Sequence, residues 1–125
     1  MIQIPLGLMV LKWDGELGAV VEAMFPKNLS ITPNFVNQIF SMHFSGDLSN
    51  AQNLIHLQAS DKKIVSKLMN FGSIKRSVAL IMYKNESIPN NEEKLVEISK
   101  IVKSNLNYGL TNLESIYKQH FSRNK

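Results

Sequence analysis

The first quarter of the chain contains two apolar runs separated by a short turn sequence. The first run, residues 4–13, has apolar side chains from Leu8 to Leu11 that leave no polar face. Such a run indicates a strand that is covered on both sides, near the centre of a sheet. Asp14-Gly15 is typical of a tight turn, and a second run follows over residues 19–25. The pattern predicts a β-hairpin whose second strand lies at a sheet edge.

A helix is predicted where the chain reads Thr32-Pro33. Threonine caps the free N–H groups of a first turn, and proline at the first helical position removes no needed donor. One face of this helix is apolar and comprises Val36, Ile39, Phe40 and His43. Phe35 and Met42 flank that face, so the apolar arc is wider than packing on one side requires. Residues 45–47, Ser-Gly-Asp, are expected to end the helix.

Three strands are predicted in the middle of the chain. Residues 54–59 alternate in their second half, and residues 64–71 form the next run. Residues 60–63, Ser-Asp-Lys-Lys, are expected to form the hairpin loop between them. Residues 77–83 are uninterrupted and apolar, which makes them a second candidate for the sheet centre.

Two helices are predicted at the end of the chain. The first begins at Asn90 or Asn91 and ends at Gly109, which is a candidate C-cap. The second begins with the capping box Thr111 to Glu114. The order β-β-α-β-β-β-α-α predicts an α/β fold, with a five-stranded, antiparallel-rich sheet between helices. A length of 125 residues suits one domain, residues 1–125.

Composition narrows the class of protein. With no cysteine, the chain has no disulfide, thiolate zinc site or cysteine nucleophile, and we expect a cytoplasmic protein. No apolar run reaches the length of a membrane span, so membrane contact is at most peripheral. Net charge is −2 over residues 1–60 and +6 over residues 61–125. Lysine outnumbers arginine by 12 to 2, which disfavours nucleic-acid binding.

Residues that carry chemistry do not cluster in the sequence. His43, His56 and His120 fall on three different predicted elements, and no metal-ligand spacing or phosphate-binding glycine loop occurs. Asp14 and Glu16 lie together at a hairpin tip, where solvent leaves little to separate their pKa values for acid–base work. The sequence therefore predicts no enzyme activity and no catalytic, cofactor-binding or metal-binding residues.

Apolar surface suggests contact with another protein instead. The second strand of the hairpin has a single charge, and the helix after it is apolar beyond one face. Apolar edges and patches of this kind mark strand addition or helix packing. The predicted interface comprises Val20, Glu22, Met24, Phe35, Ile39 and Met42.

A basic patch offers an alternative function. Its members are Lys62, Lys63, Lys67, Lys75 and Arg76. Such a patch binds anionic lipid or nucleic acid through charge. An enzyme is a third and weaker reading.

The element order and the opening residues resemble a longin domain. Longin halves of folliculin-like, nitrogen-permease-regulator-like and DENN-type GTPase regulators begin with an apolar strand, an acidic turn, Gly-Pro and a strand that ends near proline. The matching residues here are Leu8–Trp13, Asp14, Gly18 and Phe25-Pro26, although Ala19 stands where those families often carry proline. Similar openings occur in small stand-alone longin-like or roadblock-like proteins of archaea.

The resemblance implies a non-enzymatic scaffold that forms a homodimer, or a heterodimer with another longin or roadblock protein. Such dimers serve as platforms for small Ras-like GTPases or vesicle-trafficking complexes. They often form through the second strand and the first helix. A roadblock-like GTPase regulator is the nearest alternative, although that family normally starts with a helix before the first hairpin.

Overall fold

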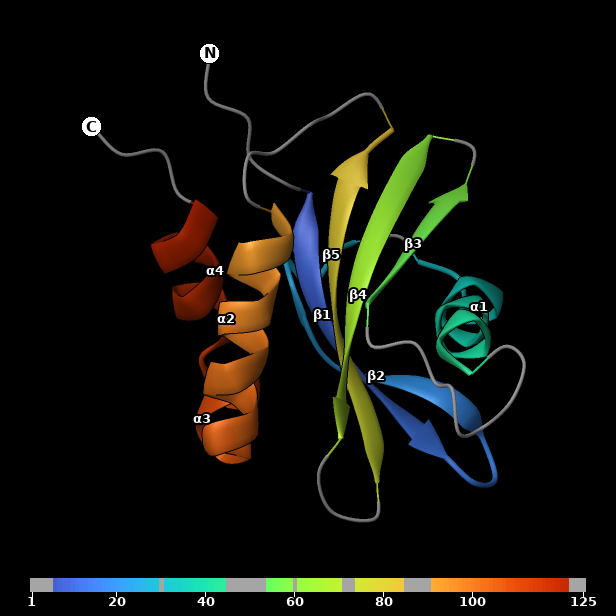
Figure 1. The fold of residues 1–125 in the computed structure, drawn as a ribbon, viewed down its shortest axis with the longest axis horizontal. Helices are drawn as coiled ribbons and strands as arrows, with labels where there is room; N and C mark the ends of the chain where they lie inside the picture. Colours follow the sequence, from blue (N-terminus) through green and yellow to red (C-terminus); the bar gives the residue numbers. More distant parts are fainter. Residues whose placement is uncertain are drawn as a thin grey trace.

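A five-stranded antiparallel sheet forms the centre of the structure (Figure 1). The computed structural model describes residues 6–29, 31–44, 54–59, 61–70, 74–84 and 91–121. In chain order the elements are β1 (Gly7–Asp14), β2 (Gly18–Phe25), α1 (Pro33–His43), β3 (Leu54–Ala59), β4 (Lys62–Asn70), β5 (Lys75–Tyr83), α2 (Asn91–Ser104), α3 (Leu106–Thr111) and α4 (Leu113–Phe121). The strand order is β2-β1-β5-β4-β3, so β2 and β3 are the edges.

Helices cover both faces of this sheet. Figure 1 shows α1 on one side and α2, α3 and α4 together on the other. Each side has its own core, because successive side chains of a strand point to opposite faces. Met9, Ile64 and Ile81 pack toward α1, while Val10, Val65 and Leu80 pack toward the other three helices. The α/β fold with a sheet between helices, predicted from the sequence, is confirmed.

The predicted central strands are buried as expected. In β1, Leu8 to Leu11 have no exposed surface, and the same is true of Val78 to Met82 in β5. β5 lies in the middle of the sheet, with β1 beside it, and β2 is an edge strand as predicted. An apolar run without a polar face therefore identified two of the three strands that have a neighbouring strand on each side and helices over both faces.

The first helix also begins as predicted. The Thr32 side chain accepts a hydrogen bond from the backbone N–H of Phe35 at 3.2 Å, and Pro33 is the first helical residue. The buried face is the predicted one, Val36, Ile39, Phe40 and His43. The helix ends at His43 with Phe44 as its C-cap, and the predicted terminator, residues 45–47, lies outside the described residues.

The end of the chain forms three helices where two were predicted. Asn105 ends the first, because its side chain accepts the N–H of Tyr108 at 3.2 Å and caps α3. Gly109 is no C-cap: it lies inside α3, where a Cβ atom would come within 3.0 Å of the Val102 Cα atom. The last helix begins after Asn112 and not at Thr111, since Asn112 caps the end of α3.

Two strands are longer than the sequence predicted. Lys62 and Lys63, assigned to a loop, open β4 and pair with Ala59 and Gln58 of β3. β5 begins at Lys75, two residues before the predicted start. Backbone pairing to the neighbouring strand overrides the low strand preference of lysine at these positions.

Candidate functional site

The tip of the β1–β2 hairpin is held by local hydrogen bonds. The Asp14 carboxylate accepts the N–H groups of Leu17 at 3.0 Å and Glu16 at 2.8 Å. These two bonds lower the pKa of Asp14 below its usual value, because they favour the charged carboxylate. Gly18 follows with a φ of +86°, which favours glycine. Asp14 is therefore the residue that shapes this turn.

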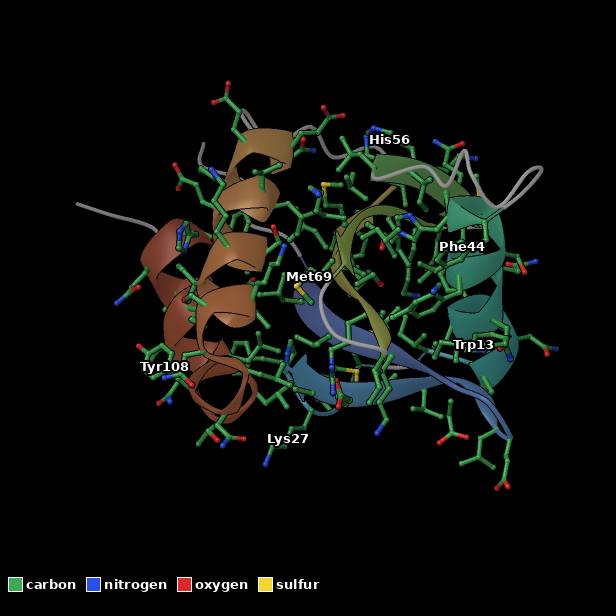
Figure 2. All side chains as sticks on the ribbon, turned by 60° about the horizontal axis from the view of Figure 1, so that its bottom comes forward. Trp13, Lys27, Phe44, His56, Met69 and Tyr108 are labelled. Atoms are coloured by element: carbon green, nitrogen blue, oxygen red, sulfur yellow. The ribbon has the colours of Figure 1, made fainter. Side chains whose placement is uncertain are left out.

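An apolar groove lies between this hairpin and the end of α1. It has a volume of about 730 Å³ and is lined by Trp13, Gly15, Phe40, Ser41, Phe44, Ile74 and Lys75. The Trp13 ring centroid lies 6.1 Å from that of Phe40, which lies 6.4 Å from that of Phe44. The Lys75 Nζ atom lies 5.7 Å above the Phe44 ring. Figure 2 shows Trp13 and Phe44 beside α1. We call this feature the aromatic groove.

Large apolar side chains are exposed around the aromatic groove. Trp13 is 46% exposed and Ile74, on its other wall, is 41% exposed. Leu17 in the hairpin turn is 74% exposed, and Val21 of β2 is 39% exposed. Val21 is paired with Leu11, whose side chain belongs to the core under α1. Val21 and Trp13 therefore face the same side of the sheet, and we call Trp13, Leu17 and Val21 the hairpin patch.

The residues predicted as an interface do not form one surface. Ile39 is fully buried in the core and has no exposed surface for a partner, so its place in the set was wrong. Phe35, Met42 and Met24 are half-buried against the same core. They line its margin beside α1.

A register shift in the β1–β2 ladder divides the predicted interface within β2. Val10 pairs with Ala23 and Leu11 pairs with Val21, so Glu22 is the extra residue of a bulge. Val20 pairs with Lys12, on the face opposite Leu11 and Val21. Glu22 contacts Lys12 and Arg76 on the same face as Val20, whereas Met24 packs toward α1.

The basic patch predicted from the sequence is also divided. Arg76 is buried and donates from Nε to Glu22 Oε1 at 2.7 Å and from Nη2 to Oε2 at 3.2 Å. Lys75 lies at the aromatic groove, and Lys62 is 3.3 Å from the Asp61 carboxylate. Alternation along β4 and β5 sends these side chains to both faces of the sheet, so they make no single binding surface.

A second groove brings together lysines that the sequence analysis did not combine. It has a volume of about 270 Å³ and is lined by Lys67, Leu68, Met69, Val96, Ser99, Lys100 and Lys103. Burial, followed by the nearby charge of Lys103, lowers the pKa of Lys67 below its usual value. We call this feature the lysine groove. Its sequence signal is Lys67 itself, which alternates with the buried Val65 and Met69.

The three histidines lie apart, as predicted. His43 is buried with Nε2 2.8 Å from the Ser66 hydroxyl oxygen, and His56 lies 2.6 Å from the Glu92 carboxylate. His120 Nε2 lies 3.6 Å from Glu97. Within the described ranges, no group of three or more His, Cys, Asp or Glu side chains is placed to hold a metal ion.

The helices of the described segments are too short or too polar to cross a bilayer. No family model matches the chain, and no curated protein matches it. Function is therefore inferred from the hairpin patch and the two grooves.

Proposed function

We propose that this chain is a non-enzymatic scaffold that dimerises through the edge strand β2 and the hairpin patch. One observation carries the proposal. Of the six large apolar side chains that are exposed in the described part of the chain, four are Trp13, Leu17, Val21 and Ile74. All four belong to the hairpin or line the aromatic groove. Contiguous exposed apolar surface of this kind marks protein contacts.

The edge of β2 supports strand addition by a second copy. β2 pairs with β1 alone among the described strands, which leaves a row of backbone N–H and C=O groups for another strand. Edge strands are commonly protected by charged side chains, but the only charge in β2 is Glu22. Its carboxylate is held by Arg76 at 2.7 Å and lies 3.8 Å from Lys12. Two such edges meet across a two-fold axis as identical surfaces.

The family assignment within this proposal is longin-like. The first six elements follow the order on which the resemblance rests, although three helices come after them where that order has two. In that family the second strand and first helix commonly form the dimer, and both lie beside the hairpin patch here. The dimer then presents a platform for a small Ras-like GTPase or a trafficking complex.

Light scattering coupled to size exclusion tests the dimer. We expect the wild type to elute as a dimer over a concentration series, and Val21→Lys to elute as a monomer, because it places a charge on the apolar edge. Gln58→Lys is the matched control, since it adds the same charge to an exposed position on the opposite edge strand β3. A monomeric wild type at high concentration, or dissociation by Gln58→Lys alone, contradicts the proposal.

Crosslinking tests the GTPase partner separately. Lys75 lines the aromatic groove and Lys27 is exposed just after β2, so both carry reactive amines beside the proposed contact surface. A lysine-specific crosslinker applied to the native cell extract is expected to join a small GTPase to one of them. Crosslinks to a GTPase that form only at lysines of α2 or α4 would contradict a GTPase contact beside the hairpin and the aromatic groove.

A further inference from the structure

We infer that the lysine groove between β4 and α2 binds a phosphate group through Lys67, Lys100 and Lys103. This site lies on the face of the sheet opposite α1, away from the hairpin patch. Its volume of about 270 Å³ accommodates a phosphate or a diphosphate. The inference goes beyond dimerisation, and neither site requires the other.

Lys67 occupies a position where the fold otherwise places apolar side chains. Its neighbours on the same face of β4, Val65 and Met69, are both buried in the core with α2. Figure 2 shows Met69 between the sheet and α2. Its partners on the adjacent strands, Leu54 and Val78, are apolar. The Lys67 side chain therefore lies on the face of the sheet that α2 covers, between apolar neighbours.

The Lys67 ammonium has donors left for a ligand. One of its three N–H groups donates to the Leu68 carbonyl oxygen at 3.1 Å. Among the described residues no carboxylate lies within ion-pair distance of Lys67, Lys100 or Lys103. α2 carries three acids: Glu92 pairs with His56, Glu97 pairs with His120, and the exposed Glu93 makes no ion pair with the three lysines.

α2 supplies the rest of the groove from one stripe of its surface. Val96, Ser99, Lys100 and Lys103 follow the three- and four-residue spacing that brings side chains together on a helix. Lys100 and Lys103 are therefore neighbours of like charge, which is unfavourable without an anion. The lowered pKa of Lys67, caused by burial and by Lys103, is consistent with the same repulsion.

The three lysine ammonium groups indicate that the ligand is a phosphate. Lysine binds phosphate as a point charge, and three lysines match a group that carries up to two negative charges. The apolar side chains of Met69 and Val96 line the groove and reduce the solvent screening of those charges. A phosphate of this kind comes from a soluble diphosphate or from a lipid headgroup, and the experiment separates the two sources.

Calorimetric titration with inorganic pyrophosphate tests the site directly. We expect wild-type protein to bind, and Lys100→Gln to bind at least about ten-fold more weakly, because a hydrogen bond to a charged group is lost. Lys100 is exposed, so this variant keeps the fold. Lys67→Met is expected to reduce affinity at least as much, since methionine suits the apolar face around it.

Lys63→Met is the matched control for charge alone. Lys63 lies on the same strand and face as Lys67 but pairs with Met82 and Gln58 at the far end of β4, outside the groove. The affinity of the Lys63→Met variant for pyrophosphate is expected to equal that of the wild type. Equal losses in Lys63→Met and Lys67→Met would overturn the inference, because they would indicate nonspecific attraction.

Vesicle flotation identifies the source of the phosphate. Vesicles of phosphatidylcholine that contain a phosphatidylinositol monophosphate are compared with vesicles of phosphatidylcholine alone. Lysine-dependent flotation supports a lipid headgroup, and pyrophosphate binding without flotation supports a soluble ligand. Failure of both probes to bind wild-type protein overturns the inference.

Discussion

The ion pair between Arg76 and Glu22 shows how one residue links three strands. Arg76 of β5 crosses over Lys12 of β1, its partner in the ladder, to reach Glu22 in the bulge of β2. The bidentate geometry and the low exposure of the two side chains, 10% for Arg76 and 13% for Glu22, make this a strong charge-assisted contact. The contact holds the bulge in place and removes the one charge that would protect the β2 edge.

Replacing Glu22 with glutamine is expected to destabilise the fold by about 2 kcal/mol. The amide keeps the size of the side chain but removes the negative charge that contacts the buried Arg76 guanidinium. Urea denaturation followed by circular dichroism measures the change. Glu114→Gln is the control, because Glu114 pairs with Lys118 on an exposed helix face and such pairs contribute about 0.3–0.5 kcal/mol. Equal effects of the two variants would show that the buried pair contributes no more than a surface pair.

Among the elements, the short helix α3 depends on a close approach to α2. Gly109 lies against the backbone of Val102, and a Cβ atom there would be 3.0 Å from both the Val102 Cα and Cγ2 atoms. Glycine costs a helix about 1 kcal/mol relative to alanine, so its presence within α3 indicates that packing decides. The glycine therefore lets α3 pack closely against α2.

Gly109→Ala is therefore expected to lower the unfolding free energy, although alanine is the better helix former. Overpacking against a backbone atom costs about 1–3 kcal/mol, which over most of that range is more than the gain of about 1 kcal/mol in helix propensity. Thermal and urea denaturation give the net change. Gly15→Ala is the matched substitution, because nothing lies within 4 Å of a Cβ atom in the hairpin turn. A Gly109→Ala protein as stable as the Gly15→Ala protein would contradict the packing argument.

Most elements were predictable from the sequence because they depend on local patterns. Each of these elements is recognisable from about a dozen consecutive residues. β1 and β5 are uninterrupted apolar runs, and α1 has an N-cap followed by an apolar face of four residues. The bulge at Glu22 depends instead on pairing between strands, and the burial of Arg76 depends on Glu22, which is 54 positions away in the sequence. The lysine groove joins Lys67 to α2 for the same reason. The periodicity of apolar residues along the chain does not reveal such contacts between distant segments.

For the whole molecule, the aromatic groove and the lysine groove lie on different sides of the sheet. The hairpin patch and the aromatic groove belong to the side of α1, and the lysine groove belongs to the side of α2. A dimer joined at β2 would extend one sheet through both copies and leave the two lysine grooves open. Protein contact and phosphate binding are therefore compatible in the same assembly.

Dimerisation also predicts how thermal stability depends on concentration. Association stabilises the folded state by mass action, so a ten-fold rise in protein concentration adds about 1.4 kcal/mol per dimer. For a dimer of about 250 residues this raises the Tm by about 3–5 °C. Differential scanning fluorimetry across two decades of concentration measures the shift. Val21→Lys is expected to abolish the concentration dependence and Gln58→Lys to preserve it. A Tm that is independent of concentration in the wild type would mean that the β2 edge stays unpaired, and its exposed apolar side chains would then need another partner.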